Sequence, residues 1–234
     1  MLLETRRLRK EYVRAKMKKS FCALDNVNLS LNRGESVSII GRSGSGKSTL
    51  LNIIAGLLTP TSGEVVFNGT NLYELGDDEL SRLRNSSISY LPQGTSLISS
   101  LNAIENICLP YYLGGHKDDC YASACKLLEE VGLGQLEESY PAEMSGGEML
   151  RVAIARALMN SPELIIADEP TSDLDVETAH EIMELLAGFN KRGTALLIVT
   201  HDLEMTRYSE NIYKIESGRL QNFSGQGVFV RTAP

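Results

Sequence analysis

Short apolar runs along the chain end at glycine, proline or charged residues and alternate with segments of helical character. Runs of this kind are Ser36–Ile40, Ile88–Leu91, Leu164–Ala167 and Ala195–Val199. The last two are apolar on both faces, which is typical of parallel strands buried between layers of helices. The segment Lys47–Leu58 has helical character and follows the first run directly. The alternation predicts an α/β fold with a mostly parallel sheet.

The last part of the pattern predicts a hairpin. Ile212–Ile215 and Arg219–Leu220 are short runs joined by Ser217-Gly218. A two-residue connection that contains glycine favours a tight turn between antiparallel strands. We therefore expect two paired strands in this part of the chain.

The character of the chain changes between about residue 95 and residue 160. Pro110, the pair Gly114-Gly115 and Pro141 separate segments of helical periodicity, such as Tyr121–Val131. Because proline and glycine interrupt helices, we interpret the region as a helical subdomain inserted into the α/β core. Residues 1–234 then form a single domain. Its core comprises residues 1–92 and 161–234, and its helical subdomain comprises about residues 93–160.

Composition is ordinary for a globular protein. The chain has 234 residues, of which 42% are hydrophobic, and a net charge of −7. It contains no uninterrupted apolar stretch of about 18 residues and no signal-peptide pattern, so we expect it to stay in the cytoplasm unless a partner holds it at a membrane. The acidic balance gives no support to nucleic-acid binding as the main task. The four cysteines have no zinc-like spacing, so reduced structural thiols are expected.

Basic residues gather near the N-terminus in spite of the acidic total. They are Arg6, Arg7, Arg9, Lys10, Arg14, Lys16, Lys18 and Lys19. Two interpretations stay open. The cluster is either a solvated edge of a sheet or a contact surface for phosphates or lipid headgroups.

A phosphate-binding pattern joins the first apolar run to the helical segment after it. Gly41–Ser48 fits G-x-x-x-x-G-K-[ST] in full. Glycines let backbone N–H groups surround phosphate oxygens, and the helix N-terminus adds partial positive charge. Lys47 is expected to reach the β- and γ-phosphates, while Ser48 offers a hydroxyl to Mg²⁺. The expected nucleotide contacts are Gly41, Ser43, Gly44, Ser45, Gly46, Lys47, Ser48 and Thr49.

Two carboxylates follow the apolar run Leu164–Ala167. A lone carboxylate at the end of a buried strand is costly, and a bound cation removes that cost. Asp168 is therefore the candidate Mg²⁺ ligand that accompanies Ser48. Glu169 is placed to orient an attacking water or to accept its proton. Together with the phosphate-binding pattern, these residues predict hydrolysis of ATP with Mg²⁺.

Three further features exceed the needs of a simple nucleotide hydrolase. Ser145-Gly146-Gly147 opens another helical run and predicts a second anion site. One nucleotide cannot occupy both glycine-rich sites of one domain, so we expect a symmetric dimer in which each turn caps the γ-phosphate held by the other chain. Asp173, in the polar loop Ser172–Asp175, can carry information across that interface, and Asp175 also fits a helix N-cap. His201 follows a buried strand and is placed to contact the γ-phosphate.

Taken in order, these motifs resemble the ATP-binding cassette (ABC) transporter nucleotide-binding domain over nearly the whole chain. Its Walker A, Q-loop, signature, Walker B, D-loop and H-loop are matched by Gly41–Ser48, Gln93, Met144–Glu148, Leu164–Glu169, Ser172–Asp175 and His201. The resemblance implies a P-loop NTPase core of the RecA type, with an antiparallel β subdomain and the inserted α-helical subdomain. It also implies catalytic roles for Lys47, Glu169 and His201, and for Gln93, which lies beside Mg²⁺.

The resemblance further implies an aromatic side chain that stacks on adenine. Tyr12 is the candidate because of its spacing to the phosphate-binding pattern, and the nearby Phe21 is the alternative.

A narrower resemblance concerns the partner. Pro141–Glu148, Arg151–Leu158, Ala167–Thr171 and Glu105-Asn106 are similar to the branch with lipoprotein-release, macrolide-exporter and cell-division ATPases. That branch implies a homodimer on the cytoplasmic face of the membrane. It drives an integral-membrane permease that has few helices and a large extracytoplasmic domain, in an exporter or mechanotransmission-type system. The apolar segment Ser96–Tyr112 is expected to offer a groove to a permease helix.

Other outputs of the ATPase compete with transport as interpretations of the sequence. The main alternative is regulation of a membrane-bound hydrolase, as in cell-division members of the branch. The chain lacks the long coiled coils of DNA-repair members and the second cassette of translation factors. A small-molecule kinase would need neither the Ser145-Gly146-Gly147 turn nor His201. The transported substrate is not readable from this chain.

Overall fold

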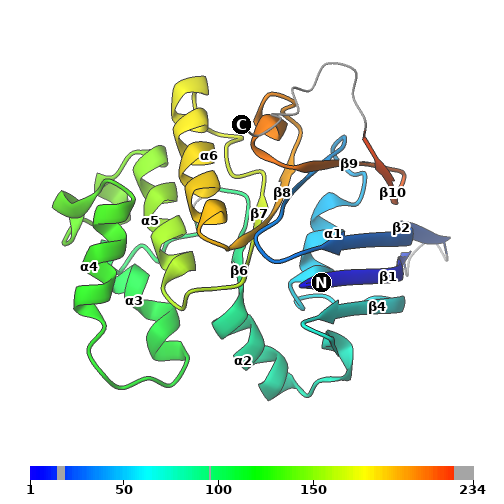
Figure 1. The fold of residues 1–234 in the computed structure, drawn as a ribbon, viewed down its shortest axis with the longest axis horizontal. Helices are drawn as coiled ribbons and strands as arrows, with labels where there is room; N and C mark the ends of the chain where they lie inside the picture. The colour runs from blue at the N-terminus through cyan, green and yellow to red at the C-terminus, as the bar shows by residue number, and fades with distance from the viewer. Residues whose placement is uncertain (15–18, 95, 224–234) are drawn as a thin grey trace.

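The computed structural model describes residues 1–14, 19–94 and 96–223, and these form two sheets with helices around them (Figure 1). The larger sheet has the order β10-β9-β3-β8-β7-β6. Its strands are β3 (Ser36–Ile40), β6 (Ile88–Leu91), β7 (Leu164–Asp168), β8 (Ala195–Thr200), β9 (Asn211–Glu216) and β10 (Arg219–Asn222). All neighbours are parallel except β9 and β10. The predicted mostly parallel sheet and the predicted hairpin are thus confirmed.

The smaller sheet is antiparallel and has the order β2-β1-β4-β5. Its strands are β1 (Leu3–Arg14), β2 (Lys19–Leu31), β4 (Ser62–Phe67) and β5 (Thr70–Asn71). Helix α1 (Lys47–Ile54) lies between the two sheets, because its apolar side chains share one buried cluster with strands of both. This packing holds the start of α1 against the carboxyl end of β3.

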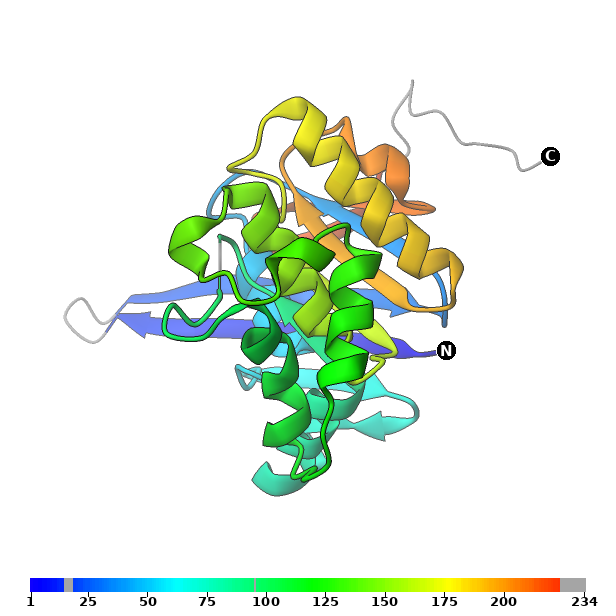
Figure 2. The same cartoon turned by 90° about the vertical axis from the view of Figure 1, so that its left-hand side faces the viewer.

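The remaining helices cover the sheets on their outer sides. They are α2 (Asp77–Ser87), α3 (Ala103–Leu113), α4 (Tyr121–Glu130), α5 (Gly146–Leu158) and α6 (Val176–Lys191), with short 3₁₀ turns at Leu72–Glu74, Gly134–Leu136, Pro141–Glu143 and Met205–Tyr208. Figure 2 faces the green helices α3 to α5, which stand together on one side of the larger sheet. They share a second buried cluster with α6 and with one face of that sheet. No helix in the described part of the chain is long and apolar enough to cross a bilayer.

Helix α1 is shorter than the apolar pattern predicts. The expected helix Lys47–Leu58 ends at Ile54. Gly56 adopts a left-handed φ of 68°, and the Leu57 N–H donates to the Asn52 carbonyl. These are the features of a glycine-terminated helix end, and they outweigh the continuing apolar pattern.

The N-terminal basic residues lie partly inside the smaller sheet and partly at its edge, so the solvated-edge interpretation stays open. Arg6 and Arg9 stand where β1 pairs with both β2 and β4, whereas beyond Arg9 β1 pairs only with β2, the outermost strand. Arg6 and Arg9 are exposed, and they pair with acidic residues of the same sheet. Lys16 and Lys18 lie outside the described residues. All four cysteines are free thiols, and Cys108 and Cys120 are buried.

Candidate active site

The loop between β3 and α1 turns its backbone toward an open concave face. Gly41 cannot be replaced without a clash, because an added Cβ would lie 2.6 Å from the Ile215 carbonyl. Gly46 has a φ of 110°, and an added Cβ there would lie 2.5 Å from the Ala23 carbonyl. Gly44 has a φ of 77° but faces open space. The outer glycines therefore seat the loop on its neighbours, while the loop's centre is free to approach a ligand.

Lys47 crosses this loop from the first turn of α1. Its side chain is 6% exposed, and Nζ donates to the Gly41 carbonyl at 2.8 Å and to the Arg42 carbonyl at 3.2 Å. Nearby, the hydroxyl of Ser45 is buried without a hydrogen-bond partner among the described residues. A buried ammonium and an unpaired hydroxyl beside the N-terminus of α1 suit an anion with several oxygen atoms.

Asp168 ends β7 and is almost fully buried. Burial raises the pKa of its carboxyl group, while a hydrogen bond from Ser48 acts in the opposite direction. The hydroxyl of Tyr90 on β6 lies 3.5 Å from Asp168 Oδ2, and burial with this carboxylate raises the pKa of Tyr90 to about 12. The Ser48 and Asp168 oxygens are hard ligands, as Mg²⁺ requires, and two protein ligands are enough when phosphate oxygens and water complete the shell. The donor set therefore fits Mg²⁺.

Glu169 holds its carboxylate between two donors. Lys47 Nζ lies 3.3 Å from Oε1, and His201 Nδ1 lies 2.7 Å from Oε2. The backbone of Glu169 has a φ of 49°, and its N–H donates to the Val199 carbonyl at 2.8 Å. A left-handed φ is costly for glutamate, and such conformations gather at functional sites. The neighbouring strands β3, β8 and β7 thus bring Lys47, His201 and Glu169 together from separate motifs.

The turn Ser145-Gly146-Gly147 is built differently. Ser145 is the N-cap of α5, and its hydroxyl and backbone N–H both bond to Glu148 Oε2 at 2.8 Å. Gly147 packs against α6, since an added Cβ would lie 2.8 Å from Thr178 Cγ2. Within the described ranges, no hydrogen bond or ion pair joins this turn to the loop 41–48. The chain therefore carries two separate helix-N-terminal turns of the kind that binds anions.

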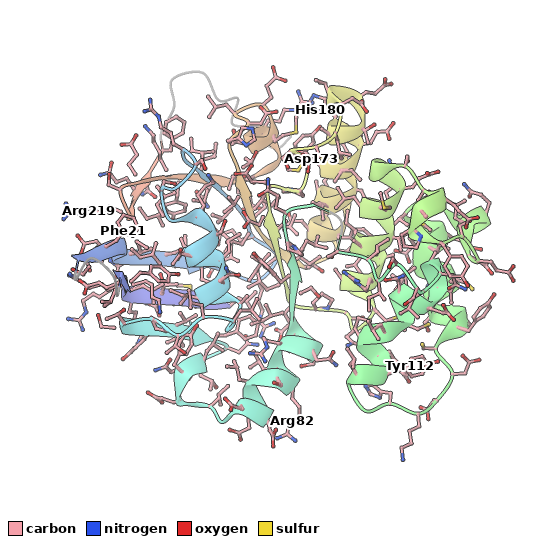
Figure 3. All side chains as sticks on the ribbon, turned by 180° about the vertical axis from the view of Figure 1, so that it is seen from behind. Phe21, Arg82, Tyr112, Asp173, His180 and Arg219 are labelled. Atoms are coloured by element: carbon pink, nitrogen blue, oxygen red, sulfur yellow. The ribbon has the colours of Figure 1, made fainter. Side chains whose placement is uncertain are left out.

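Gln93 and Asp173 are both exposed. Gln93 lies in the bend that follows β6, and Asp173 lies in the turn between β7 and α6. Asp175 caps α6 by accepting a hydrogen bond from the Thr178 N–H, as the sequence predicts. In Figure 3, Asp173 and His180 of α6 are both labelled in the upper part of the view. The Gln93 and Asp173 side chains are thus placed at the surface, where a second chain or a partner can reach them.

Tyr12 and Phe21 face each other across the β1–β2 pair. A hollow of about 520 Å³ beside the loop 41–48 is lined by Phe21, Cys22, Arg42 and the β9–β10 turn, among others. Tyr12 is not among its lining residues, and its ring lies under the Lys10 ammonium at 5.3 Å. Figure 3 shows Phe21 on the same side of the molecule as Arg219 of β10. Both aromatic residues are exposed, so both remain candidates for the adenine contact.

The expected partner groove needs a correction. Ile104 and Ile107 of α3 are buried in the core of the helical region, so they are not available to a partner. Ile98 is 41% exposed, and Leu101 and Leu109 are half-buried. A larger hollow of about 650 Å³ lies between α2 and the end of α3, with Arg82 and Tyr111 among its lining residues. Figure 3 labels Arg82 on α2 and Tyr112 on α3, both in the lower part of the view.

Three residues of these sites, Tyr90, Cys22 and Arg42, were not predicted. The only hint for Tyr90 was that a tyrosine stands in the predicted strand Ile88–Leu91. Cys22 and Arg42 line the hollow together because the β9–β10 turn joins their segments: the Asp25 N–H donates to the Gly218 carbonyl, and the Gly218 N–H donates to the Ser45 carbonyl.

The comparisons with known proteins agree with this geometry. The profile of the family described as "ABC transporter" matches residues 24–172. A protein of Methanocaldococcus jannaschii named "Uncharacterized ABC transporter ATP-binding protein MJ1508" is 44% identical over 200 residues, which are 85% of this chain and 89% of that protein. A solved dimer of the ATP-binding cassette MJ0796, in a post-hydrolysis state bound to ADP and Pi, is 37% identical with a TM-score of 0.87, covering 96% of this chain and 100% of that one. The cbiO1 structure from Clostridium perfringens is 29% identical with a TM-score of 0.82, covering 94% and 86% of the two chains.

Proposed function

Because this chain belongs to the ABC transporter family and is one of its ATP-hydrolysing subunits, we propose that two copies close around two ATP molecules and drive a separate membrane permease. The observation that carries this proposal is the separation of the two anion-binding turns. Only the loop 41–48 has a lysine and a nearby carboxylate pair, whereas Ser145-Gly146-Gly147 has neither. A second copy in a two-fold arrangement supplies the missing turn to each nucleotide.

The loop 41–48 and the start of α1 bind the phosphates in this proposal. Gly41, Ser43, Gly44, Ser45, Gly46 and Thr49 present backbone N–H groups and small side chains to the phosphates. Lys47 binds the β- and γ-phosphates, exchanging its carbonyl contacts for phosphate oxygens. Ser48, Asp168 and Gln93 would hold Mg²⁺. Bound Mg²⁺ would neutralise charge on the transferred phosphoryl group.

Glu169 orients the attacking water and accepts its proton. Its contact with His201 keeps the carboxylate at the carboxyl ends of β7 and β8, and His201 is close enough to reach the γ-phosphate from the same side. From the other copy, Ser145, Gly146 and Gly147 cap the γ-phosphate, and Asp173 approaches across the interface. Tyr12 stacks on adenine, with Phe21 as the alternative residue.

The partner belongs to the same proposal. We assign the permease to the branch of few-helix permeases with a large extracytoplasmic domain, in an exporter or mechanotransmission-type system, and place the ATPase on the cytoplasmic face of the membrane. The sequence resemblance supports this assignment. Residues 1–234 act as one domain in which the helices of about residues 93–160 turn against the core. The exposed Ile98 and the hollow between α2 and α3 are the docking surface.

The test is the ATPase rate per chain as a function of protein concentration. We expect the rate per chain to rise with concentration, because each site needs residues from two copies. The Glu169→Gln variant should turn over about 10²–10⁴-fold more slowly and should accumulate as an ATP-bound dimer. A rate per chain that stays constant at all concentrations would exclude the composite site. A Glu169→Gln variant with normal turnover would exclude the role of this carboxylate.

A further inference from the structure

Two exposed side chains of opposite charge lie at the two halves of the composite site. Arg42 belongs to the loop 41–48, and Asp173 belongs to the turn between β7 and α6. Within residues 1–14, 19–94 and 96–223, no ion pair or hydrogen bond involves the Arg42 guanidinium or the Asp173 carboxylate. Both charges are therefore available to a partner outside the chain.

The backbone of Arg42 is fixed, whereas its side chain is not engaged. The Arg42 carbonyl accepts hydrogen bonds from Lys47 Nζ and from the Ser45 N–H, each at 3.2 Å. Glu216 of β9 lines the same hollow as Arg42, but its carboxylate binds Lys214 Nζ at 2.5 Å. The hydrogen bond from Lys214 is the main cause that lowers the pKa of Glu216, and the charge of Arg42 adds less. Lys214 thus matches this acid, and Arg42 stays an excess cation on the loop.

Asp173 is the acid of its turn that has no structural task in the described part of the chain. The two carboxylate oxygens of Asp175 accept from the Thr178 N–H at 3.0 Å and from the Thr178 hydroxyl at 2.8 Å. The turn itself is closed by backbone bonds, since the Ser172 N–H donates to the Glu169 carbonyl at 3.2 Å. The turn therefore forms without the Asp173 side chain.

Contacts within the chain hold Asp173 beside the Ser145 turn. An added Cβ at Gly146 would lie 3.7 Å from Leu174 Cδ2, and one at Gly147 would lie 2.8 Å from Thr178 Cγ2. The Ser145 turn thus packs directly on the residue that follows Asp173 and on the first turn of α6. A molecule that binds the Ser145 turn from outside therefore comes close to Asp173.

In the proposed dimer, that molecule is the loop 41–48 of the second copy. The Ser145 turn of one chain caps the γ-phosphate that lies on this loop of the other chain. Arg42 is an exposed cation of the loop, whereas Lys47 is buried beneath it. Two-fold symmetry makes the same contact twice in each dimer. Opposite charges that meet across an interface favour the correct partner and fix how it docks.

We propose that Arg42 of each copy forms an ion pair with Asp173 of the other copy. This inference rests on the proposed function, because the two residues meet only in a composite dimer. A guanidinium can bind a carboxylate through two parallel hydrogen bonds, which aligns the two segments as well as attracting them. The Asp173 turn starts at the Glu169 carbonyl, so the pair ties the phosphate-binding loop of one chain to the backbone of Glu169 in the other.

Charge reversal in the Glu169→Gln chain tests the ion pair, because this chain should form stable dimers with ATP. Arg42→Glu alone and Asp173→Arg alone each place like charges at both contacts of the dimer. If one such contact weakens the dimer about twofold, each variant alone should dimerise about fourfold more weakly than the parent. A mixed dimer has one original contact and one contact with exchanged signs, so like charges meet at neither.

The two variants are mixed in equal amounts before ATP is added, and native mass spectrometry counts the dimers. Random pairing makes half of the dimers mixed, whereas the same twofold effect per contact raises this share to about four fifths. Raising ammonium acetate from about 0.1 M to about 1 M should bring the share back toward one half, because salt screens exposed charges. A chain that carries both substitutions has complementary charges again and should dimerise like the parent.

Arg42→Glu mixed with Glu184→Arg is the matched control. Glu184 is an exposed acid of α6 that lies about 13 Å beyond Asp175 along the helix axis, at 1.5 Å per residue. The substitutions change the same charges, but Glu184→Arg leaves the Asp173 contact as it is. The mixed share of this pair should not exceed one half. Melting temperatures without ATP check that each variant folds like the parent.

Each outcome decides for or against the pair. If the parent dimerises but Arg42→Glu and Asp173→Arg pair at random, the ion pair is wrong and the composite dimer stands. Random pairing is also the result if Arg42 binds the nucleotide of its own chain, because a mixed dimer would then keep the defect. If the parent does not dimerise with ATP, the composite site and the ion pair both fail.

Discussion

Asp168 illustrates how one buried carboxylate links catalysis to stability. Burial raises its pKa, so the folded state binds a proton more tightly than the unfolded state does. This difference in pKa sets how stability depends on pH. The protonated Asp168 carboxyl contributes fully to stability below the ordinary aspartate pKa of about 4, and the contribution is lost as pH rises through the raised pKa of the folded state. At neutral pH the ionised side chain therefore destabilises the protein without bound metal.

We predict that Asp168→Asn raises the melting temperature at pH 7 in the absence of nucleotide and Mg²⁺, and that the gain shrinks as the pH falls toward 4. The same variant should lose most Mg²⁺-dependent ATPase activity, because the amide is a poor ligand for a hard cation. Thermal melts across this pH range provide the measurement. Asp173→Asn, at an exposed position, is the control and should show no comparable gain. A gain that is equal at pH 4 and pH 7 would contradict the prediction.

The backbone conformation and the contacts of Glu169 could not be predicted from the sequence. Its position after a buried strand identifies it as a candidate base, but its left-handed backbone arises from the turn between β7 and α6. The contacts to Lys47 and His201 depend on which strands are neighbours in the sheet, and strand order is a property of the whole fold. Tyr90 was missed for the same reason, since only the β6–β7 pairing brings it to Asp168.

The paired strands β1 and β2 offer two aromatic side chains for the contact with adenine. Tyr12 and Phe21 are cross-strand partners, so spacing along the chain cannot separate them. Base–aromatic stacking contributes about 1–3 kcal/mol by alanine substitution in nucleic-acid complexes. If Tyr12 stacks on adenine, Tyr12→Ala should weaken ATP binding about fivefold or more, and Phe21→Ala should change it little. Equilibrium titration of both variants with ATP and with inorganic triphosphate checks this, since a stacking loss affects only the nucleotide. The reverse ranking of the two variants would move the base into the hollow lined by Phe21.

At the scale of elements, the strands were easier to predict than the helix ends and the surfaces. The strands β3, β6, β7 and β8 were recognisable as short apolar runs, and β7 and β8 most clearly, because they are buried along their whole length and burial on both faces favours apolar residues. The end of α1 was placed too late, since Leu57 and Leu58 continue the apolar pattern beyond Gly56. The role of α3 was partly misjudged. Ile104 and Ile107 fit a core or a partner groove equally well in the sequence, and only the packing of α3 on α5 decides for the core.

The contact between Arg156 and Ser96 shows a second limit of sequence reading. Arg156 and Ser96 are 60 positions apart, and neither residue has an unusual neighbour in the sequence. Their contact exists because α5 returns along β6 after the excursion through α3 and α4. Long-range polar contacts of this kind have no periodicity, so hydrophobic patterning cannot predict them.

At the scale of the whole molecule, the separation of the two anion-binding turns allows a complementation test with two variants that carry opposite defects. A chain with Lys47→Ala has a defective loop 41–48 and an intact Ser145 turn. A chain with Ser145→Arg has the reverse defect, and the exposed position of Ser145 accommodates the larger side chain. Each variant alone forms dimers in which both composite sites are defective, so we expect little ATPase activity from either.

Mixing the two variants should restore activity. A mixed dimer contains one site with both defects and one site with none, because the intact loop of one chain meets the intact turn of the other. Random pairing makes half of the dimers mixed, and half of their sites are intact, so about one quarter of the wild-type rate should return if the sites act independently. The rate should depend on the mixing ratio, with its maximum at equal amounts. Two Lys47→Ala preparations mixed in the same way are the control. If the mixture is no more active than its components although both variants melt at the wild-type temperature, each chain must hold its nucleotide without the partner's turn.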